Sequence, residues 1–125
     1  MRALVIDDSK AVRSIIRRIL ADCGFREILE AGHGKEALEV ISQHGVPDLS
    51  VVDWSMPVMD GLTFVRAVRG FPEAAPMSIL MVTTETERPR IVGALAAGAN
   101  EYLTKPFTKE AMVEKLGILG FGVNA

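Results

Sequence analysis

Two patterns of apolar residues alternate along the whole chain. Short runs of consecutive apolar residues, many of them β-branched, are typical of strands buried on both faces of a parallel sheet. These runs predict strands at residues 3–6, 27–30, 49–53, 78–83 and 101–104. After each run, apolar residues recur at helical spacing, which predicts helices within residues 12–20, 37–41, 62–68, 88–97 and 108–116.

The helical spacing also predicts which side chains face the sheet. The first helix should bury Val12, Ile15, Ile16, Ile19 and Leu20 and direct Arg13, Arg17 and Arg18 toward solvent. The fourth should bury Ile91, Val92 and Leu95 and end at Gly98, because glycine commonly follows the last helical turn. The tail, residues 117–125, is rich in glycine, so we expect it to fray.

Strands that alternate with helices indicate an α/β fold. We expect a doubly wound, five-stranded parallel sheet with helices on both faces and right-handed crossovers. The chain has 125 residues, which is the length of one domain. We therefore expect a single domain over residues 1–125, with no room for a second one.

Composition narrows the classes of function. The chain has 14 basic and 16 acidic residues, a net charge of −2, so nothing favours nucleic acid or an anionic membrane as a partner. Cys23 is the only cysteine, which excludes an internal disulfide and fits a reducing compartment. No apolar run approaches the roughly 20 residues that span a bilayer. We expect a soluble, cytoplasmic protein.

Polar residues end or directly follow four of the predicted strands, at Asp7-Asp8, Asp53, Thr83-Thr84 and Lys105, which Pro106 follows. The carboxyl ends of parallel strands share one edge of a sheet, where ligands bind in such folds. Two carboxylates about 4 Å apart repel by about 4 kcal/mol at an effective dielectric constant of about 20. A cation would relieve this repulsion, and a site of hard oxygen ligands suits Mg²⁺.

This cluster of acids suits the transfer of a phosphoryl group to a carboxylate. Asp53 is the expected nucleophile, Lys105 offsets the developing charge, and the Thr83 hydroxyl completes the set. Neither His33 nor His44 follows a strand of this cluster, which makes histidine the weaker candidate. Taken alone, Asp7 and Asp8 would equally serve as helix caps.

The same residues resemble those of response-regulator receiver domains. The resemblance rests on Asp7-Asp8, Asp53-Trp54-Ser55-Met56-Pro57, Met59-Asp60-Gly61, Thr83 and Lys105-Pro106-Phe107. These motifs follow the family's order and extend over nearly the whole chain. The segments around Asp53 and Lys105 are most similar to those of single-domain chemotaxis response regulators. The resemblance implies a flavodoxin-like sheet with strand order 2-1-3-4-5.

The resemblance also implies roles for individual residues. Asp53 would accept a phosphoryl group from the phosphohistidine of a sensor kinase. Asp8 and Asp53 would bind Mg²⁺ directly, Asp7 would act through water, and the Ser55 backbone carbonyl would be a further ligand. Lys105 would pair with the phosphoryl group.

Further residues would connect phosphorylation to its output and set its lifetime. Thr83 would hydrogen-bond the phosphoryl group, and Tyr102 matches the aromatic switch that moves inward with it. The alternative for Tyr102 is a static surface aromatic on an edge strand. Thr84 stands where chemotaxis relatives usually have alanine, and we expect it to hinder the attacking water. Ser55 and Glu85 are the other residues expected to tune phosphate lifetime.

The resemblance implies that this chain is not an enzyme but a phosphoacceptor switch, one that promotes its own phosphorylation and dephosphorylation. The expected output surface comprises residues 88–98, Tyr102 and residues 109–115. Expected partners are a chemotaxis-type sensor histidine kinase, a target such as the flagellar motor switch, and a phosphatase. We expect a monomer that binds neither nucleic acid nor membrane. The alternatives are a phosphorelay shuttle, a phosphate sink or, less well supported, an aspartyl-phosphate phosphatase, for which the chain offers no cap domain.

Two nucleotide-binding motifs compete with this interpretation. Gly32-x-Gly34-x-x-Ala37 follows a strand and opens a helix, as a dinucleotide fingerprint does. The chain is too short for two nucleotide-binding halves, and no acidic residue clearly fills the ribose-binding position. A P-loop is excluded because Glu36 follows Lys35.

Overall fold

The computed structural model describes residues 1–84 and 86–122, and its elements follow the predicted alternation. The strands are β1 (Arg2–Ile6), β2 (Glu27–Ala31), β3 (Leu49–Asp53), β4 (Ser78–Thr83) and β5 (Glu101–Thr104). The helices are α1 (Lys10–Asp22), α2 (Gly34–His44), α3 (Gly61–Val68), α4 (Ile91–Ala97) and α5 (Lys109–Ile118). Short 3₁₀ turns at Pro72–Ala74 and Arg88–Arg90 were not predicted.

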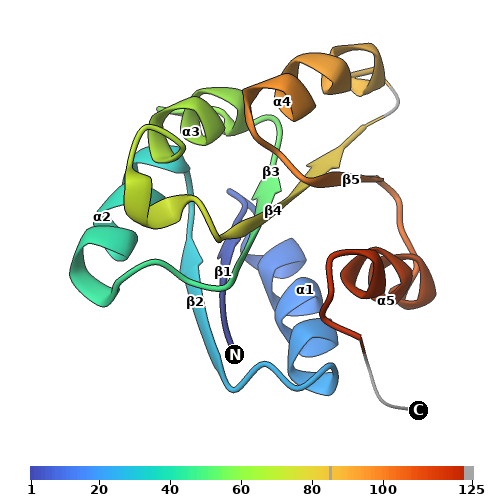
Figure 1. Ribbon diagram of the computed structural model, residues 1–125. Coiled ribbons are helices and arrows are strands. Elements are labelled where there is room, and N and C mark those ends of the chain that lie inside the picture. The colour runs from blue at the N-terminus through green and yellow to red at the C-terminus, as the bar shows by residue number, and fades with distance from the viewer. Residues whose placement is uncertain (85, 123–125) are drawn as a thin grey trace.

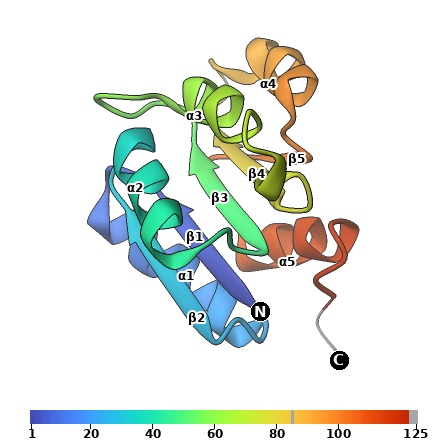
Figure 2. The same ribbon diagram turned by 60° about the vertical axis from the view of Figure 1, so that its left-hand side comes forward.

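All five strands pair in parallel in the order β2-β1-β3-β4-β5. Helices α1 and α5 lie on one face of the sheet, and α2, α3 and α4 lie on the other (Figures 1 and 2). The doubly wound parallel sheet and its strand order are therefore confirmed.

The alternation of side chains along each strand divides the interior into two cores. In β1, Ala3 and Val5 pack with the side chains of α1 and α5, whereas Leu4 and Ile6 pack with those of α2, α3 and α4. Successive residues of a strand point to opposite faces, so a strand covered on both faces must be apolar throughout. This requirement explains the unbroken apolar runs in the sequence.

Three of the predicted inward-facing side chains are in fact exposed. Ile15 on α1 is 55% exposed, and Val92 and Leu95 on α4 are 72% and 39% exposed. Helix α4 instead buries Ile91 and Ala94. Helical spacing identifies a stripe, but the width of the stripe that is covered depends on the neighbouring elements.

The prediction of a fraying tail is wrong for the residues that can be checked. Helix α5 continues to Ile118, and the Phe121 ring packs at 5.3 Å from that of Phe25. Apolar packing therefore holds the chain beyond the last helix. Residues 123–125 lie outside the described part of the chain.

The start of α3 lies unusually close to the end of β3. The Gly61 amide donates to the Trp54 carbonyl at 2.9 Å. A Cβ at Gly61 would lie 2.5 Å from the Asp53 carbonyl oxygen, so only glycine fits there without a shift of the backbone. This close approach fixes the course of the loop that leaves Asp53.

Candidate functional site

Three carboxylates converge at the carboxyl ends of β1 and β3. One carboxylate oxygen from each of Asp7, Asp8 and Asp53 lies within 4.8 Å of the other two. Asp7 and Asp53 are 1% and 7% exposed, while Asp8 is exposed at the rim. The convergence predicted from the strand ends is present in the structure.

Lys105 joins two of these acids from the loop after β5. Its ammonium lies 3.1 Å from Asp53 Oδ1 and 3.3 Å from Asp7 Oδ2. The Lys105 backbone amide donates to the Thr83 carbonyl at 2.6 Å, which ties this loop to the end of β4. The Lys105-Pro106 bond is cis.

The pKa values of this pair show which effect dominates at Asp53. Burial, with a further contribution from the Asp7 charge, raises the pKa of Asp53 from 3.8 to about 6, although Lys105 acts in the opposite direction. Burial lowers the pKa of Lys105, but its bond and attraction to Asp53 outweigh that effect and raise it overall. The shift at Lys105 favours the charged pair, whereas the shift at Asp53 opposes ionisation. Lys105 alone therefore does not supply enough positive charge to keep the Asp53 carboxylate ionised as readily as in water, and a further cation would favour the ionised form.

These residues fit a divalent cation. Three converging carboxylates that one lysine does not neutralise form a hard, oxygen-rich donor set, which suits Mg²⁺. Asp7 already accepts the Ser9 amide on Oδ1, at 2.8 Å, and faces Lys105 with Oδ2. Asp8 and Asp53 are therefore the carboxylates best placed to contact an ion directly.

Thr83 lies at the end of β4 with an unusual hydroxyl. The residue is 0% exposed, and within residues 1–84 and 86–122 its Oγ1 has no hydrogen-bond partner. A buried polar atom without a partner costs about 1–3 kcal/mol. Such an atom is suited to a ligand that brings an acceptor to it.

Tyr102 lies one strand further, on β5, paired in register with Met81. It is half-buried and packs against the core beneath α2, α3 and α4. The Lys115 ammonium lies 4.9 Å from the centre of its ring and also pairs with Glu101. This position is compatible with the predicted switch, but movement of the ring stays a prediction.

The remaining predicted site residues lie on the loops after β3 and β4. Ser55 is exposed, two residues after Asp53, and the ligand role of its carbonyl stays a prediction. Thr84 is exposed, and its hydroxyl lies 2.8 Å from that of Thr86. Glu85 lies outside the described residues. Asp60 caps α3 by accepting the Thr63 amide at 2.8 Å and does not join the acid cluster.

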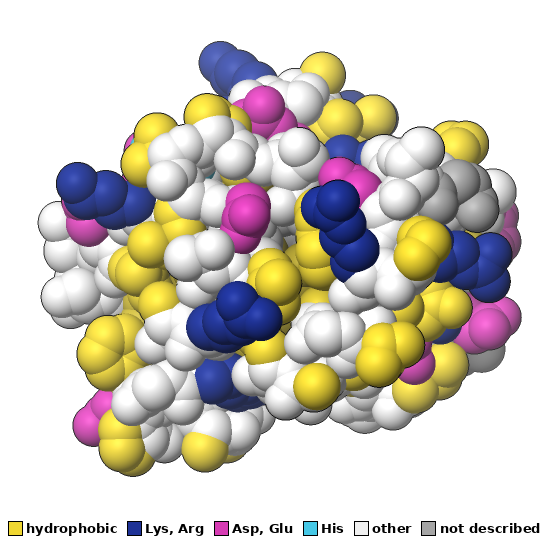
Figure 3. Space-filling model, turned by 90° about the horizontal axis from the view of Figure 1, so that it is seen from above, with side chains coloured by type: hydrophobic (Ala, Val, Ile, Leu, Met, Phe, Trp, Pro, Cys, Tyr) yellow, Lys and Arg dark blue, Asp and Glu magenta, His cyan; other side chains and the backbone are white. Residues whose placement is uncertain are grey.

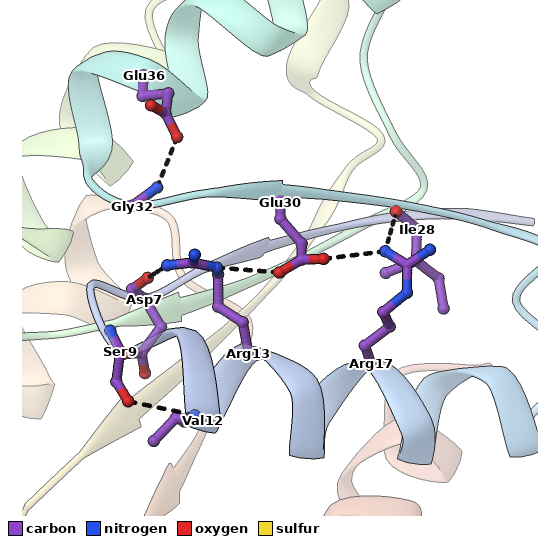
Figure 4. A network of polar contacts seen from close by, with 9 residues as sticks. All are labelled: Asp7, Ser9, Val12, Arg13, Arg17, Ile28, Glu30, Gly32 and Glu36. Carbon is purple, nitrogen blue, oxygen red and sulfur yellow. Dashed lines mark hydrogen bonds and ion pairs between the residues drawn. The ribbon is translucent and has the colours of Figure 1, made fainter.

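Sequence reasoning missed two residues that hold the acid pair. Ser9 caps α1 and donates its amide to Asp7, and the Arg13 guanidinium donates to the Asp7 carbonyl oxygen at 2.6 Å (Figure 4). A serine just before a helical stripe is a recognisable cap signal. The sequence gives no such signal for Arg13, because its contact depends on the direction of a long side chain.

An apolar depression of about 380 Å³ lies beside Lys105. It is lined by Val12 and the exposed Ile15 of α1, together with Pro106 and Phe107.

Figure 3 views the molecule from above in Figure 1 and shows acidic, basic and hydrophobic side chains interspersed on that side. This mixture differs from the continuous basic surface that binds nucleic acid.

A doubly wound sheet whose edge carries an acid cluster, a lysine and a hydroxyl is the arrangement expected of a receiver domain. The response regulator receiver domain family matches residues 3–117. A chemotaxis protein CheY homolog of Campylobacter jejuni is 42% identical over 123 residues, covering 98% of this chain and 95% of that protein. Chemotaxis protein CheY1 of Helicobacter pylori is 40% identical, covering 95% and 96% of the two chains.

Solved structures agree with these relatives. The structure of chemotaxis response regulator CheY4 of Vibrio cholerae matches with a TM-score of 0.85 at 36% identity, covering 94% of this chain and 97% of that one. This chain belongs to the response regulator receiver domain family and is CheY-like. Within the described residues, no helix has both the length and the apolar character needed to cross a membrane.

Proposed function

We propose that this chain is a phosphoacceptor switch that receives a phosphoryl group on Asp53 from the phosphohistidine of a sensor kinase. The observation that carries this proposal is the convergence of three carboxylates within 4.8 Å, two of them contacted by Lys105. When bound, Mg²⁺ would supply positive charge that offsets the carboxylates and the phosphoryl oxygens. Asp8 and Asp53 would hold the ion directly, Asp7 through water, and Ser55 through its carbonyl.

The Thr83 hydroxyl supports a conformational response to phosphorylation. A phosphoryl group on Asp53 would bring oxygen acceptors to the edge where this buried hydroxyl lacks a partner. Formation of that bond favours one of two conformations of the loop after β4, and Tyr102 on β5 follows the change. Lys105 pairs with the phosphoryl group and keeps its contact with β4.

We propose that the output is a protein contact in chemotaxis. The relatives that match nearly end to end are named as chemotaxis proteins, which supports a role in chemotaxis. The output surface would be α4, β5 and α5, where Val92 and Leu95 of α4 are exposed and Tyr102 of β5 is half-buried. The flagellar motor switch is the leading target. A phosphorelay shuttle or a phosphate sink would share the same phosphorylation chemistry.

The depression beside Lys105 supports docking of the phosphodonor. Ile15, Pro106 and Phe107 offer apolar surface next to the proposed acceptor. A donor domain that covers these residues would bring its phosphohistidine to Asp53. We expect the receiver to act as a monomer with a separate phosphatase.

Radiolabelled acetyl phosphate tests the acceptor directly. Wild-type protein should incorporate label in a Mg²⁺-dependent manner, and Asp53→Asn should incorporate none. Asp60→Asn is the matched control, because asparagine also caps a helix and Asp60 lies in the same loop. This control should be labelled like the wild type. Label on the Asp53→Asn variant would refute the assignment.

A further inference from the structure

Arg13 holds the main chain of the acid pair, a role that receiver chemistry alone does not require. Its side chain is 18% exposed, although the sequence predicts that it faces solvent. Arg13 Nη1 donates to the Asp7 carbonyl oxygen at 2.6 Å, and Nε donates to Glu30 Oε1 at 3.0 Å. Figure 4 shows the guanidinium lying between these two acceptors.

The Asp7 carbonyl belongs to the peptide that joins Asp7 to Asp8. A hydrogen bond to this oxygen therefore restricts the plane of that peptide and, with it, the direction in which Asp8 leaves the main chain. The Asp7 side chain has its own anchors, Ser9 and Lys105. In the part of the chain that the structure describes, the Asp8 carboxylate has no hydrogen bond or ion pair. Its direction thus depends on the main chain that Arg13 holds.

Glu30 and Arg17 keep the guanidinium of Arg13 in place. Glu30 Oε2 accepts from Arg17 Nη1 at 3.1 Å, and the same nitrogen donates to the Ile28 carbonyl at 2.8 Å. Figure 4 shows the resulting row, from Arg17 through Glu30 to Arg13 and Asp7. Partly exposed ion pairs contribute little to stability. The clearest effect of this row is therefore on the direction of the Arg13 side chain.

We propose that Arg13 is a positioning residue for the metal site. It holds the Asp7–Asp8 peptide so that the Asp8 carboxylate faces Asp53, and it thereby increases the affinity of the site for Mg²⁺. This inference rests on the proposed function. This positioning role differs from a simple effect of charge, because the positive charge of Arg13 beside the acids would by itself repel the ion and weaken its binding.

The test compares Arg13→Met with Arg17→Met. Both arginines lie on α1, contact Glu30 and donate to one main-chain carbonyl, but only Arg13 donates to Asp7. Methionine keeps an aliphatic stem in both variants. Mg²⁺ affinity is measured from Trp54 fluorescence and from the Mg²⁺ dependence of the melting temperature, and stability without Mg²⁺ is measured by urea unfolding.

Arg13→Met should weaken Mg²⁺ binding about tenfold, the lower end of the range for residues that orient metal ligands. Arg17→Met should lose similar stability but keep most of its Mg²⁺ affinity, because Glu30 still accepts from Arg13 Nε when Arg17 is replaced. Arg13→Lys keeps the charge, but its single ammonium lacks the planar fork that joins Asp7 to Glu30. Its affinity should therefore lie between those of the wild type and Arg13→Met, and this variant serves if Arg13→Met does not fold.

Unchanged or tighter Mg²⁺ binding by Arg13→Met would overturn the inference while leaving the proposed function intact. An equal loss of affinity in Arg17→Met would also overturn it, because the effect would then follow stability. Full affinity in Arg13→Lys would also count against the inference, because it would show that the planar fork of Arg13 is not needed to position Asp8. If the wild type responds to Mg²⁺ by neither readout, the proposed function fails first.

Discussion

The two halves of the site differ in how completely their polar atoms are paired. On the β1–β3 side, Asp7 is held through its amide, carbonyl and both carboxylate oxygens, and Lys105 connects it to Asp53. On the β4 side, the buried Thr83 hydroxyl has no partner among the described residues. In the first half, the acids are already held in place for a cation to bind. In the second half, the Thr83 hydroxyl gains a hydrogen bond when a ligand brings an acceptor to it.

The elements behind the two halves differ in the same way. Helix α1 buries Ile16, Ile19 and Leu20 against the sheet beneath the acid pair. Helix α4, which follows β4, is only seven residues long, buries Ile91 and Ala94, and begins after a 3₁₀ turn. Segments with few buried apolar contacts open at a lower free energy. We therefore expect the movable part of the proposed switch to lie on the β4–α4 side.

The largest expected effect comes from removing the Asp53 charge. The pKa of Asp53 is about 6 in the folded chain, above the ordinary 3.8. The folded state therefore binds more protons than the unfolded state between these values, and its stability falls as pH rises through them. At pH 8 without Mg²⁺, Asp53→Asn should be more stable than the wild type by about 3 kcal/mol. Urea unfolding at several pH values measures this difference.

The pH profile identifies the cause of that gain. The difference between Asp53→Asn and the wild type should be near zero below about pH 4 and reach its maximum above about pH 7. Asp60→Asn, which changes an exposed cap of α3, is the matched control, and the gain above pH 7 should be specific to Asp53→Asn. If Asp53→Asn has no advantage at pH 8, attraction to Lys105 outweighs burial, and the acid cluster does not need a further cation to ionise Asp53.

Thr83→Val tests the other half and should also stabilise the unphosphorylated protein. Valine replaces the unpaired hydroxyl with a methyl group of similar shape, so we expect a gain of about 1 kcal/mol in urea unfolding. Acetyl phosphate should then stabilise this variant less than the wild type. The matched control is Thr104→Val, the half-buried register partner of Thr83 on β5. A loss of stability specific to Thr83→Val would mean that the hydroxyl already has a partner.

The sequence predicts the charged residues of the site better than it predicts the residues that hold them in place. Asp53 and Lys105 follow strands whose carboxyl ends must meet in a parallel sheet, so their convergence is a consequence of topology. The contact from Arg13 to Asp7 depends on a flexible side chain and on a third residue, Glu30, which no periodicity specifies. The sequence also cannot predict that the Thr83 hydroxyl is unpaired, because this depends on whether the folded chain places a donor or acceptor within reach of it.

A smaller effect is expected from Thr84→Ala at the rim of the β4 half. Thr84 is exposed next to Thr83, and we expect it to hinder the water that attacks the phosphoryl group. Replacement by alanine should speed dephosphorylation several-fold and leave stability nearly unchanged. The decay of label after removal of the phosphodonor measures this rate. An unchanged rate would exclude Thr84 as a determinant of phosphate lifetime.

The smallest effect on stability is expected on the exposed face of α4. Val92 and Leu95 are 72% and 39% exposed, so Val92→Ser and Leu95→Ser should each change the free energy of unfolding by no more than about 0.5 kcal/mol. Ile91→Ala, at a residue that is 7% exposed on the same helix, should cost about 2–4 kcal/mol. Urea unfolding measures all three. If the serine variants cost as much as Ile91→Ala, α4 is packed as firmly as α1, and the contrast between the halves does not extend to the helices. If they cost little, these apolar side chains remain available to a target protein.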